Sequence, residues 1–216
     1  LRLLFSGALL MIYACWKYLD QVKAMLHDKK VIIMLIIFTF LGMGSSQLSY
    51  FVAVKYSNAP TATVIQFLAP VFIIIYSSLR SKMWPRRIDV VAVVGTFILA
   101  TGGRFDQLAL SPLACFWGLI AAFSEAINTV LPGKLFKKYG PIPVIGAAML
   151  VAGNAFLPIY FTQPMPKLAP VDVWVIVYII IGGTLLAYTM YLSSVQYIEP
   201  STVGMLGAFE PLIATI

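Results

Sequence analysis

Charged residues are scarce in this chain of 216 residues, where they make up only 11% of the sequence. A soluble domain carries roughly 25% charged residues, because its surface must be wetted by water. Hydrophobic residues reach 61% and lie in long runs, which leaves too little polar surface for a soluble globule. The same composition excludes a disordered chain. We therefore expect lipid to be the solvent for most of the chain.

The residues that carry most metal and nucleophilic chemistry are also scarce. The chain has one histidine, His27, and two isolated cysteines, Cys15 and Cys115, each of which lies in an apolar run. Two isolated cysteines make neither a disulfide framework nor a metal site, so we expect them to pack as small hydrophobes. We expect His27 to be solvated. The sequence lacks a Walker-type phosphate-binding loop and predicts no ATP, metal or other cofactor.

What the sequence does contain is eight apolar segments, separated by Pro, Gly, Asn and Ser. A bilayer core of about 30 Å needs about 20 helical residues. The runs are continuous rather than alternating, which favours helices over barrel strands. The sequence therefore predicts an all-α polytopic membrane protein. The predicted spans are 1–20, 31–54, 60–79, 88–103, 112–131, 142–161, 172–195 and 201–216.

The net charge of +7 is distributed by topology. Eight spans place successive loops on alternate sides of the membrane, and ten basic residues lie on one side against three on the other. Basic residues in short loops mark the cytoplasmic side, so we expect no nucleic acid to be bound. The predicted cytoplasmic loops are 21–30, 79–87 and 132–141, and the opposite loops are 55–59, 104–111 and 162–171.

A repeat relates the two halves of the chain at an offset of 141 residues. Residues 42–75 align without gaps with residues 183–216 and share seven identical positions. The shift equals five spans, so equivalent helices should cross the membrane in opposite directions, as in an inverted-topology repeat. We expect a first repeat over 1–103 and a second over 112–216. The identical pairs are Gly42/Gly183, Tyr50/Tyr191, Val54/Val195, Tyr56/Tyr197, Thr61/Thr202, Pro70/Pro211 and Ile75/Ile216.

The same offset leaves one helix of each repeat without a counterpart. Both ends of the chain also lie inside apolar runs, so we expect a fragment of a protein with ten helices and a five-plus-five repeat. An inverted repeat suits alternating access, in which two halves rock about a site near the midplane of the bilayer. The alternative is an old duplication in a static membrane protein.

Four stretches around this repeat resemble a known family. They are Tyr50 to Tyr56, Ala62 to Phe72, Tyr191 to Tyr197 and Phe209 to Leu212. Together with Arg2, which opens the first span, they are similar to the EamA-like ten-helix transporters of the drug/metabolite transporter superfamily. The resemblance implies a secondary transporter of a small metabolite, amino acid or drug-like solute, with export as the expected direction. One departure is that Arg80 to Pro85 replaces the acidic residue that often follows the family's fourth helix.

The span over 112–131 has two distinct faces at helical spacing. One face should meet protein or water and the other lipid. The first face carries Ala114, Trp117, Gly118, Ala121, Ala122, Glu125, Asn128 and Thr129. The second carries Phe116, Leu119, Ile120, Phe123, Ile127 and Val130.

Two acidic residues lie inside apolar spans, where an ionised side chain costs on the order of 3 kcal/mol. Glu125 either binds a cationic group of a solute or carries a coupling proton, or else it is hydrated near the cytoplasmic end or caps a neighbouring helix. Glu210, whose repeat equivalent is Ala69, is either functional or a carboxylate near the end of its span.

Further candidates supply kinks, amides and aromatic rings. Pro70 and Pro211 lie inside spans and should kink them. Each kink either frees backbone carbonyls to bind a solute or a water, or has a structural role alone. Small residues in the second span, Ser45 and Ser46 among them, are expected to serve close helix packing. Aromatic rings near span ends are equally expected as interface anchors. The other candidates for solute binding are Tyr50, Gln66, Trp117, Asn128, Tyr188 and Tyr191.

We expect the partners to be a small-molecule solute and the lipid bilayer, with protons as the candidate coupling ion. Two other classes stay open. An integral-membrane enzyme would need clustered acids, histidines or cysteines, which are scarce here. A channel or scaffold would show neither saturation nor exchange, whereas a transporter shows both.

Overall fold

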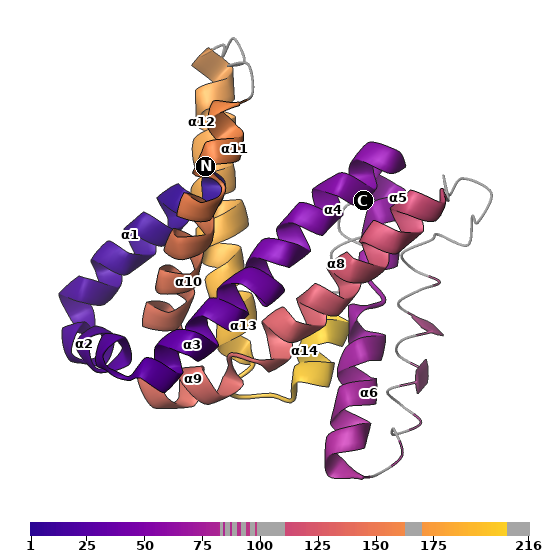
Figure 1. Ribbon diagram of the computed structural model, residues 1–216, viewed down its shortest axis with the longest axis horizontal. Coiled ribbons are helices and arrows are strands. Elements are labelled where there is room, and N and C mark those ends of the chain that lie inside the picture. Colours follow the sequence, from indigo (N-terminus) through magenta and orange to yellow (C-terminus); the bar gives the residue numbers. More distant parts are fainter. Residues whose placement is uncertain are drawn as a thin grey trace. The chain divides into compact units, whose positions relative to one another are not determined.

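The computed structural model describes residues 1–82, 84, 87, 90–91, 94–95, 98, 111–162 and 170–206. Every regular element in these ranges is a helix, which confirms the predicted all-α fold (Figure 1). The predicted span over 88–103 lies largely outside the described residues, as do residues 207–216. Among the residues that the structure describes, four helical stretches are long and apolar enough to cross a membrane: Lys29–Tyr56, Ala59–Ser81, Pro112–Tyr139 and Val171–Ser194.

Two further stretches correspond to the predicted spans 1–20 and 142–161. The helices α1 (Arg2–Lys17) and α2 (Leu19–His27) pass the same test only as one bent pair, with 107° between them. Helix α10 (Pro141–Ala155) is a shorter apolar helix. The bend between α1 and α2 means that the pair is not a single straight span.

Close packing divides the chain into two compact units. Unit 1 comprises residues 1–40 and 132–197, and unit 2 comprises residues 41–131 and 198–216. Each unit therefore draws on both halves of the sequence. The predicted repeats, 1–103 and 112–216, do not coincide with these units, and they stay a prediction about which residues are equivalent in sequence.

Unit 1 is built around α1 and α10, which lie side by side (Figure 1). A Cβ atom added at Gly153 would lie 2.5 Å from the Leu4 backbone, and one added at Gly7 would clash with Leu150. These two pairs run in opposite order along the chain, so the helices are antiparallel. The other described elements of unit 1 are α2 (Leu19–His27), α3 (Lys29–Ile37), α9 (Gly133–Tyr139), α11 (Leu157–Phe161), α12 (Pro170–Tyr178), η3 (Ile179–Leu186) and α13 (Ala187–Ser194).

Two features of the structure agree with an inverted repeat. The 141-residue offset makes α1 and α10 equivalent, and their antiparallel packing is what opposite crossing requires. A π-helical segment, η1 (Phe38–Gly44), interrupts the helix between α3 and α4, and its shifted range, 179–185, falls on η3 (Ile179–Leu186), which is also π-helical. π-helical turns are rare and often occur at functional sites.

The prediction of loops at 21–30 and 132–141 is wrong for most of their length, because α2 and α9 occupy them. Val22 and Met25, spaced three residues apart, are buried in α2. The polar residues around these two positions hide the apolar spacing in the sequence, so it did not predict a helix. Gly140 ends α9 with a φ of 76°, a conformation that L side chains rarely adopt.

Unit 2 is organised around α8 (Pro112–Val130), which packs against α4 (Ser45–Tyr56) and also contacts α5 (Ala59–Gln66), α6 (Ala69–Ser81) and α14 (Pro200–Leu206). Helix α8 begins with an N-cap, because the Ser111 hydroxyl accepts a hydrogen bond from the backbone of Ala114 at 3.1 Å. The same hydroxyl donates to the backbone oxygen of Tyr56 at 2.9 Å. The start of α8 therefore lies beside the end of α4.

The two faces predicted for α8 differ in burial as expected. Large residues of the second face are exposed, where lipid would cover them: Phe116, Leu119 and Phe123. Most of the first face is buried, namely Ala114, Gly118, Ala121, Ala122, Asn128 and Thr129. Glu125 and Trp117 are half-buried, and Ser124 and Ala126 are buried in addition.

The third predicted span is interrupted near Pro70. Helix α5 ends at Gln66, a turn follows at Phe67 and Leu68, and Pro70 occupies the first turn of α6. Proline lacks the N–H that would continue the helical hydrogen bonds, so the helix breaks just before it. Pro211, its predicted equivalent, lies outside the described residues.

Candidate functional site

A hydrogen-bonded cluster around Glu125 joins α8 to α4 inside unit 2. The Ser46 hydroxyl donates to Glu125 Oε2 at 2.7 Å. One residue earlier on each helix, the Ser124 hydroxyl donates to the Ser45 hydroxyl at 2.9 Å. Ser46 is fully buried and Glu125 is half-buried. A neutral hydroxyl on one helix thus holds the carboxylate of the other. A hydrogen bond from such a donor to an ionised carboxylate is charge-assisted.

Two more predicted residues belong to this cluster. Gln66, at the end of α5, donates from Nε2 to the Ser46 hydroxyl at 3.3 Å. Asn128 donates from Nδ2 to Glu125 Oε1 at 3.2 Å. Asn128 is fully buried, and its Oδ1 has no hydrogen-bond partner among the residues that the structure describes. A buried amide oxygen without a partner is costly, so this oxygen is available to a bound solute or water.

The cluster lies within the apolar part of its helices. At about 1.5 Å per residue, Ser46 lies about 15 Å along the helix from Tyr56, and Glu125 lies about 20 Å from Pro112. The hydrogen bond between Ser111 and Tyr56 places the start of α8 beside the end of α4. Both distances fall inside a hydrocarbon core of about 30 Å.

Close helix approach makes the cluster possible. A Cβ atom added at Gly42, one turn before Ser46, would lie 3.1 Å from the Cα atom of Asn128. The glycine therefore lets the two backbones come near enough for serine, the shortest hydroxyl side chain, to reach Glu125. Sequence reasoning assigned Ser45 and Ser46 to packing and missed their hydrogen bonds. The available signal was that an acid inside an apolar helix needs donors nearby.

The predicted aromatic residues are distributed over both units. Tyr50, one turn after Ser46 on α4, shares a hydrogen bond of 3.1 Å with the Thr63 hydroxyl of α5. Trp117 lies two turns before Glu125 on α8, and its ring packs edge-to-face on Phe116 at 5.6 Å.

The other predicted residues do not join this cluster. Tyr188 and Tyr191 are half-buried on α13, which belongs to unit 1. Glu210 lies outside the described residues. Within the described ranges, no group of three or more His, Cys, Asp or Glu could hold a metal ion.

The sequence matches the EamA-like transporter family over residues 1–101 and 112–216. The chain belongs to this family. The family is one of transporters. The several apolar helices of this chain agree with that assignment, and the chain is a multi-pass membrane protein. The predicted family and the predicted membrane location are thereby confirmed.

Individual relatives are consistent with this assignment. The uncharacterized inner membrane transporter YicL of Salmonella typhimurium is 32% identical over 221 residues, which cover all of this chain and 73% of the relative. The uncharacterized transporter YdfC of Bacillus subtilis is 28% identical, over 67% of this chain and 46% of its own length. A solved crystal structure matches 99% of this chain and 74% of its own with a TM-score of 0.80. At 15% identity, that likeness concerns the fold alone.

Proposed function

We propose that this EamA-like protein is a secondary active transporter of the cell membrane. It moves a small metabolite, an amino acid or a drug-like solute by alternating access, and it works as an exporter. The family match and the relatives named as transporters support this proposal. The antiparallel packing of the equivalent helices α1 and α10 supports two inverted repeats, 1–103 and 112–216, as the basis of the mechanism.

The observation that carries the proposal is the Glu125 cluster in the apolar interior. Ionisable residues inside a bilayer are expensive, and they mark solute or proton pathways. Glu125 would bind a cationic group of the solute or take up a coupling proton, and its neutral donors Ser46 and Asn128 would hold the carboxylate in place between these events.

The break between α5 and α6 adds polar backbone beside this cluster. Discontinuous helices commonly form solute sites in transporters, because their interrupted turns expose backbone groups. Gln66 ends α5 and contacts Ser46, so the interrupted segment adjoins the carboxylate. We keep Tyr50, Trp117, Tyr188, Tyr191 and Glu210 as candidate solute contacts, and Pro70 and Pro211 as the kinks of the two repeats.

The test is counterflow in proteoliposomes that contain the purified protein. A panel of labelled amino acids, sugars and nucleobases would be screened with and without a pH gradient. We expect saturable exchange of at least one solute, and we expect Glu125→Gln to abolish the dependence on the gradient. Linear, unsaturable flux would instead indicate a channel. Full dependence on the pH gradient in Glu125→Gln would show that Glu125 does not carry the coupling proton.

A matched pair of serine variants separates the cluster from general helix packing. Ser46→Ala removes the hydrogen bond to Glu125, whereas Ser49→Ala removes only bonds from Ser49 to backbone oxygens of its own helix. One hydrogen bond contributes about 1 kcal/mol, and 1.4 kcal/mol corresponds to about tenfold in an equilibrium constant. We expect counterflow to fall between about fivefold and tenfold in Ser46→Ala and less than twofold in Ser49→Ala. Equal losses in both variants would contradict a special role for Ser46.

A further inference from the structure

Helix α2 lies across the end of α1 rather than continuing it. The two helices meet at 107°, with only Tyr18 between them. If α1 crosses the membrane, α2 runs close to the membrane plane. This orientation is that of an interfacial helix, which lies at the boundary between headgroups and acyl chains.

The corner between α1 and α2 carries the residues that anchor a helix at a membrane surface. Trp16 is 82% exposed, and Tyr13 lies beside it with ring centroids 6.3 Å apart. Lys17 Nζ lies 5.9 Å from the Tyr13 ring and 5.8 Å from the Tyr18 ring. Trp and Tyr are enriched at the level of the headgroups, so this corner marks the depth at which α2 turns into the plane.

The surface of α2 is amphipathic. Val22 and Met25 are buried against the rest of unit 1. Leu19 and Leu26, seven residues apart and therefore on nearly the same face, are exposed beside this buried stripe. Lys23 is exposed on the adjoining polar side. The helix thus presents an uncovered apolar edge together with a positive charge, as interfacial helices do.

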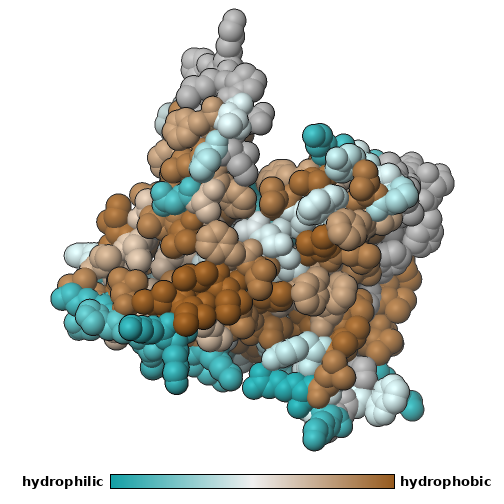
Figure 2. All heavy atoms as spheres, in the orientation of Figure 1, coloured by the Kyte–Doolittle hydropathy of each residue, from teal (hydrophilic) through white to brown (hydrophobic). Residues whose placement is uncertain are grey.

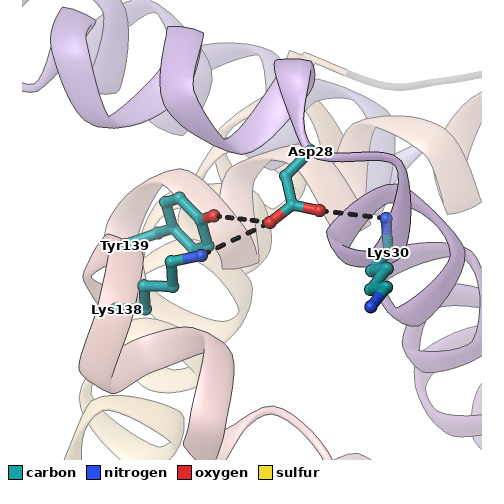
Figure 3. A network of polar contacts seen from close by, with 4 residues as sticks. All are labelled: Asp28, Lys30, Lys138 and Tyr139. Carbon is teal, nitrogen blue, oxygen red and sulfur yellow. Dashed lines mark hydrogen bonds and ion pairs between the residues drawn. The ribbon is translucent and has the colours of Figure 1, made fainter.

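The Asp28 carboxyl group fastens α2 and α3 to α9 (Figure 3). It accepts hydrogen bonds from the backbone N–H of Lys30 at 3.0 Å, from Lys138 Nζ at 3.3 Å and from the Tyr139 hydroxyl at 3.4 Å. A Cβ atom added at Gly140 would lie 3.1 Å from the side-chain oxygen of Gln21, so α2 and the end of α9 are also in close contact.

The lysines of these three elements therefore gather at one end of unit 1. Figure 2 shows hydrophilic side chains over α2 at that end, next to hydrophobic ones along α3. All six of these lysines are exposed, and five of them have no ion-pair partner among the described residues. They are Lys23, Lys29, Lys30, Lys134 and Lys137. We call these five residues, with Leu19 and Leu26, the basic platform.

We propose that the basic platform binds the headgroups of anionic phospholipids in the cytoplasmic leaflet. Lysine ammonium groups at the membrane surface attract anionic lipids, and the exposed leucines fit the acyl region just below the headgroups. An acidic soluble protein would use the lysines but leave Leu19 and Leu26 exposed to water. The aromatic corner and the orientation of α2 therefore favour lipid as the partner.

The test measures thermal unfolding of the purified full chain in a neutral detergent. Phosphatidylglycerol or phosphatidylcholine would be titrated into the micelles at low and high salt. We expect phosphatidylglycerol to raise the melting temperature saturably by several degrees, and we expect high salt to reduce this shift. Phosphatidylcholine should raise it far less. Equal shifts with the two lipids would overturn the proposal.

Charge variants connect the lipid effect to the platform. Lys29→Gln, Lys134→Gln and Lys137→Gln combined should lose at least half of the shift with phosphatidylglycerol, while the matching Lys→Arg variants should keep it. Lys55→Gln, an exposed lysine at the end of α4, is the control and should keep the full shift. A full shift in the triple glutamine variant, or an equal loss in Lys55→Gln, would contradict the proposal.

A soluble polyanion separates lipid binding from general attraction of negative charge. Polyglutamate peptide would replace the lipid in the same titration. We expect it to shift the melting temperature much less than phosphatidylglycerol, because it cannot cover Leu19 and Leu26. A shift as large as that with phosphatidylglycerol would assign the platform to acidic polymers and overturn the lipid proposal. Neither readout depends on transport, so this proposal can fail while the proposed function holds.

Discussion

Asp28 joins three helices of unit 1 through one carboxyl group. Desolvation raises the pKa of this group, but hydrogen bonds from Lys138 and from the backbone of Lys30 and Val31, together with the charge of Lys138, lower the pKa more. The pKa of Asp28 therefore lies below its ordinary value of 3.8. The ionised carboxylate stabilises the fold fully above that ordinary value, and this contribution is lost as the pH falls through the lower folded-state pKa.

We expect Asp28→Asn to lower the melting temperature by a few degrees at pH 6, because Asn can still cap α3 but cannot pair with the charge of Lys138. The difference from the wild type should shrink as the pH falls below 3.8, the ordinary pKa, and vanish once the pH has passed through the lower folded-state pKa, where the wild-type carboxylate is protonated too. Thermal unfolding between pH 3 and pH 8 measures both effects. In a Lys138→Gln background the same substitution should cause a smaller pH-dependent change, because only the backbone hydrogen bonds from Lys30 and Val31 then lower the pKa of Asp28. An undiminished change there would show that Lys138 is not the partner responsible.

Residue type alone predicted part of the candidate site. Glu125 stands out because a carboxylate is rare inside an apolar run, and Asn128 follows it by almost one helical turn. Gln66 stands out because a side-chain amide is also rare inside an apolar run. Ser46 could not be assigned to Glu125 from the sequence, because the pairing depends on the register between two antiparallel helices, which Gly42 and Asn128 fix by close contact.

At the scale of helices, glycine sets how closely α1 and α10 pack. A Cβ atom at Gly153 would meet backbone atoms of Leu4, and backbone cannot move aside as a flexible side chain can. We expect Gly153→Ala to destabilise the protein by about 1–3 kcal/mol, the usual cost of overpacking. Equilibrium unfolding in detergent measures this cost.

Gly183 provides the matched control for that substitution. It lies in an apolar helix too, but a Cβ atom there would have nothing within 4 Å among the described residues. Gly183→Ala should change stability by less than about 0.5 kcal/mol, as surface substitutions usually do. An equal loss of stability in both variants would contradict this role of the α1–α10 contact, because Ala favours a helix more than Gly does.

The π-helical segment η1 leads directly into α4, and Gly42 within it approaches Asn128 of α8. Removing one residue, Leu41, would restore an ordinary helix and shift Gly42 out of this close contact. The register between α4 and α8 that brings Ser46 to Glu125 would then be lost. We expect the deletion to abolish counterflow. Deleting Ile181 from η3, which lies in the other unit, should leave the Ser46–Glu125 hydrogen bond intact, and fluorescence-detected size exclusion would show whether each variant folds. Wild-type exchange after deletion of Leu41 would contradict this role of η1.

The long apolar helices were predictable, whereas α2, α9 and the π-helical segments were not. Helix α2 has nine residues and α9 has seven, and with several polar residues each they carry too few apolar positions to show a period. A π-helical turn adds one residue to a helix, and a continuous apolar run such as Val31 to Phe38 gives no pattern that would reveal the addition.

At the scale of the whole molecule, the charge asymmetry predicts how the chain is oriented. The sequence predicts that Lys134, in α9, lies on the cytoplasmic side and that Lys55, at the end of α4, lies on the opposite side. In a background without Cys15 and Cys115, we expect a membrane-impermeant maleimide to label Lys55→Cys in intact cells and Lys134→Cys only after permeabilisation. The reverse pattern would invert the topology and move the basic platform to the outer surface.

The two compact units could not be predicted from the repeat. The predicted repeats are residues 1–103 and 112–216, whereas packing groups residues 1–40 with 132–197. The reason is that α1 contacts its own equivalent, α10, rather than staying within its half of the sequence. Symmetry predicts that such a contact would be antiparallel, but it does not predict which equivalent helices meet.

The distance in sequence between α1 and α10 has a consequence for biosynthesis. A ribosome adds about 5–20 residues per second, so the glycine face of α1 waits on the order of ten seconds before Gly146 and Gly153 are synthesised. During that time α1 lacks α10, the helix against which it packs most extensively. A messenger truncated in between would leave α1 without this partner.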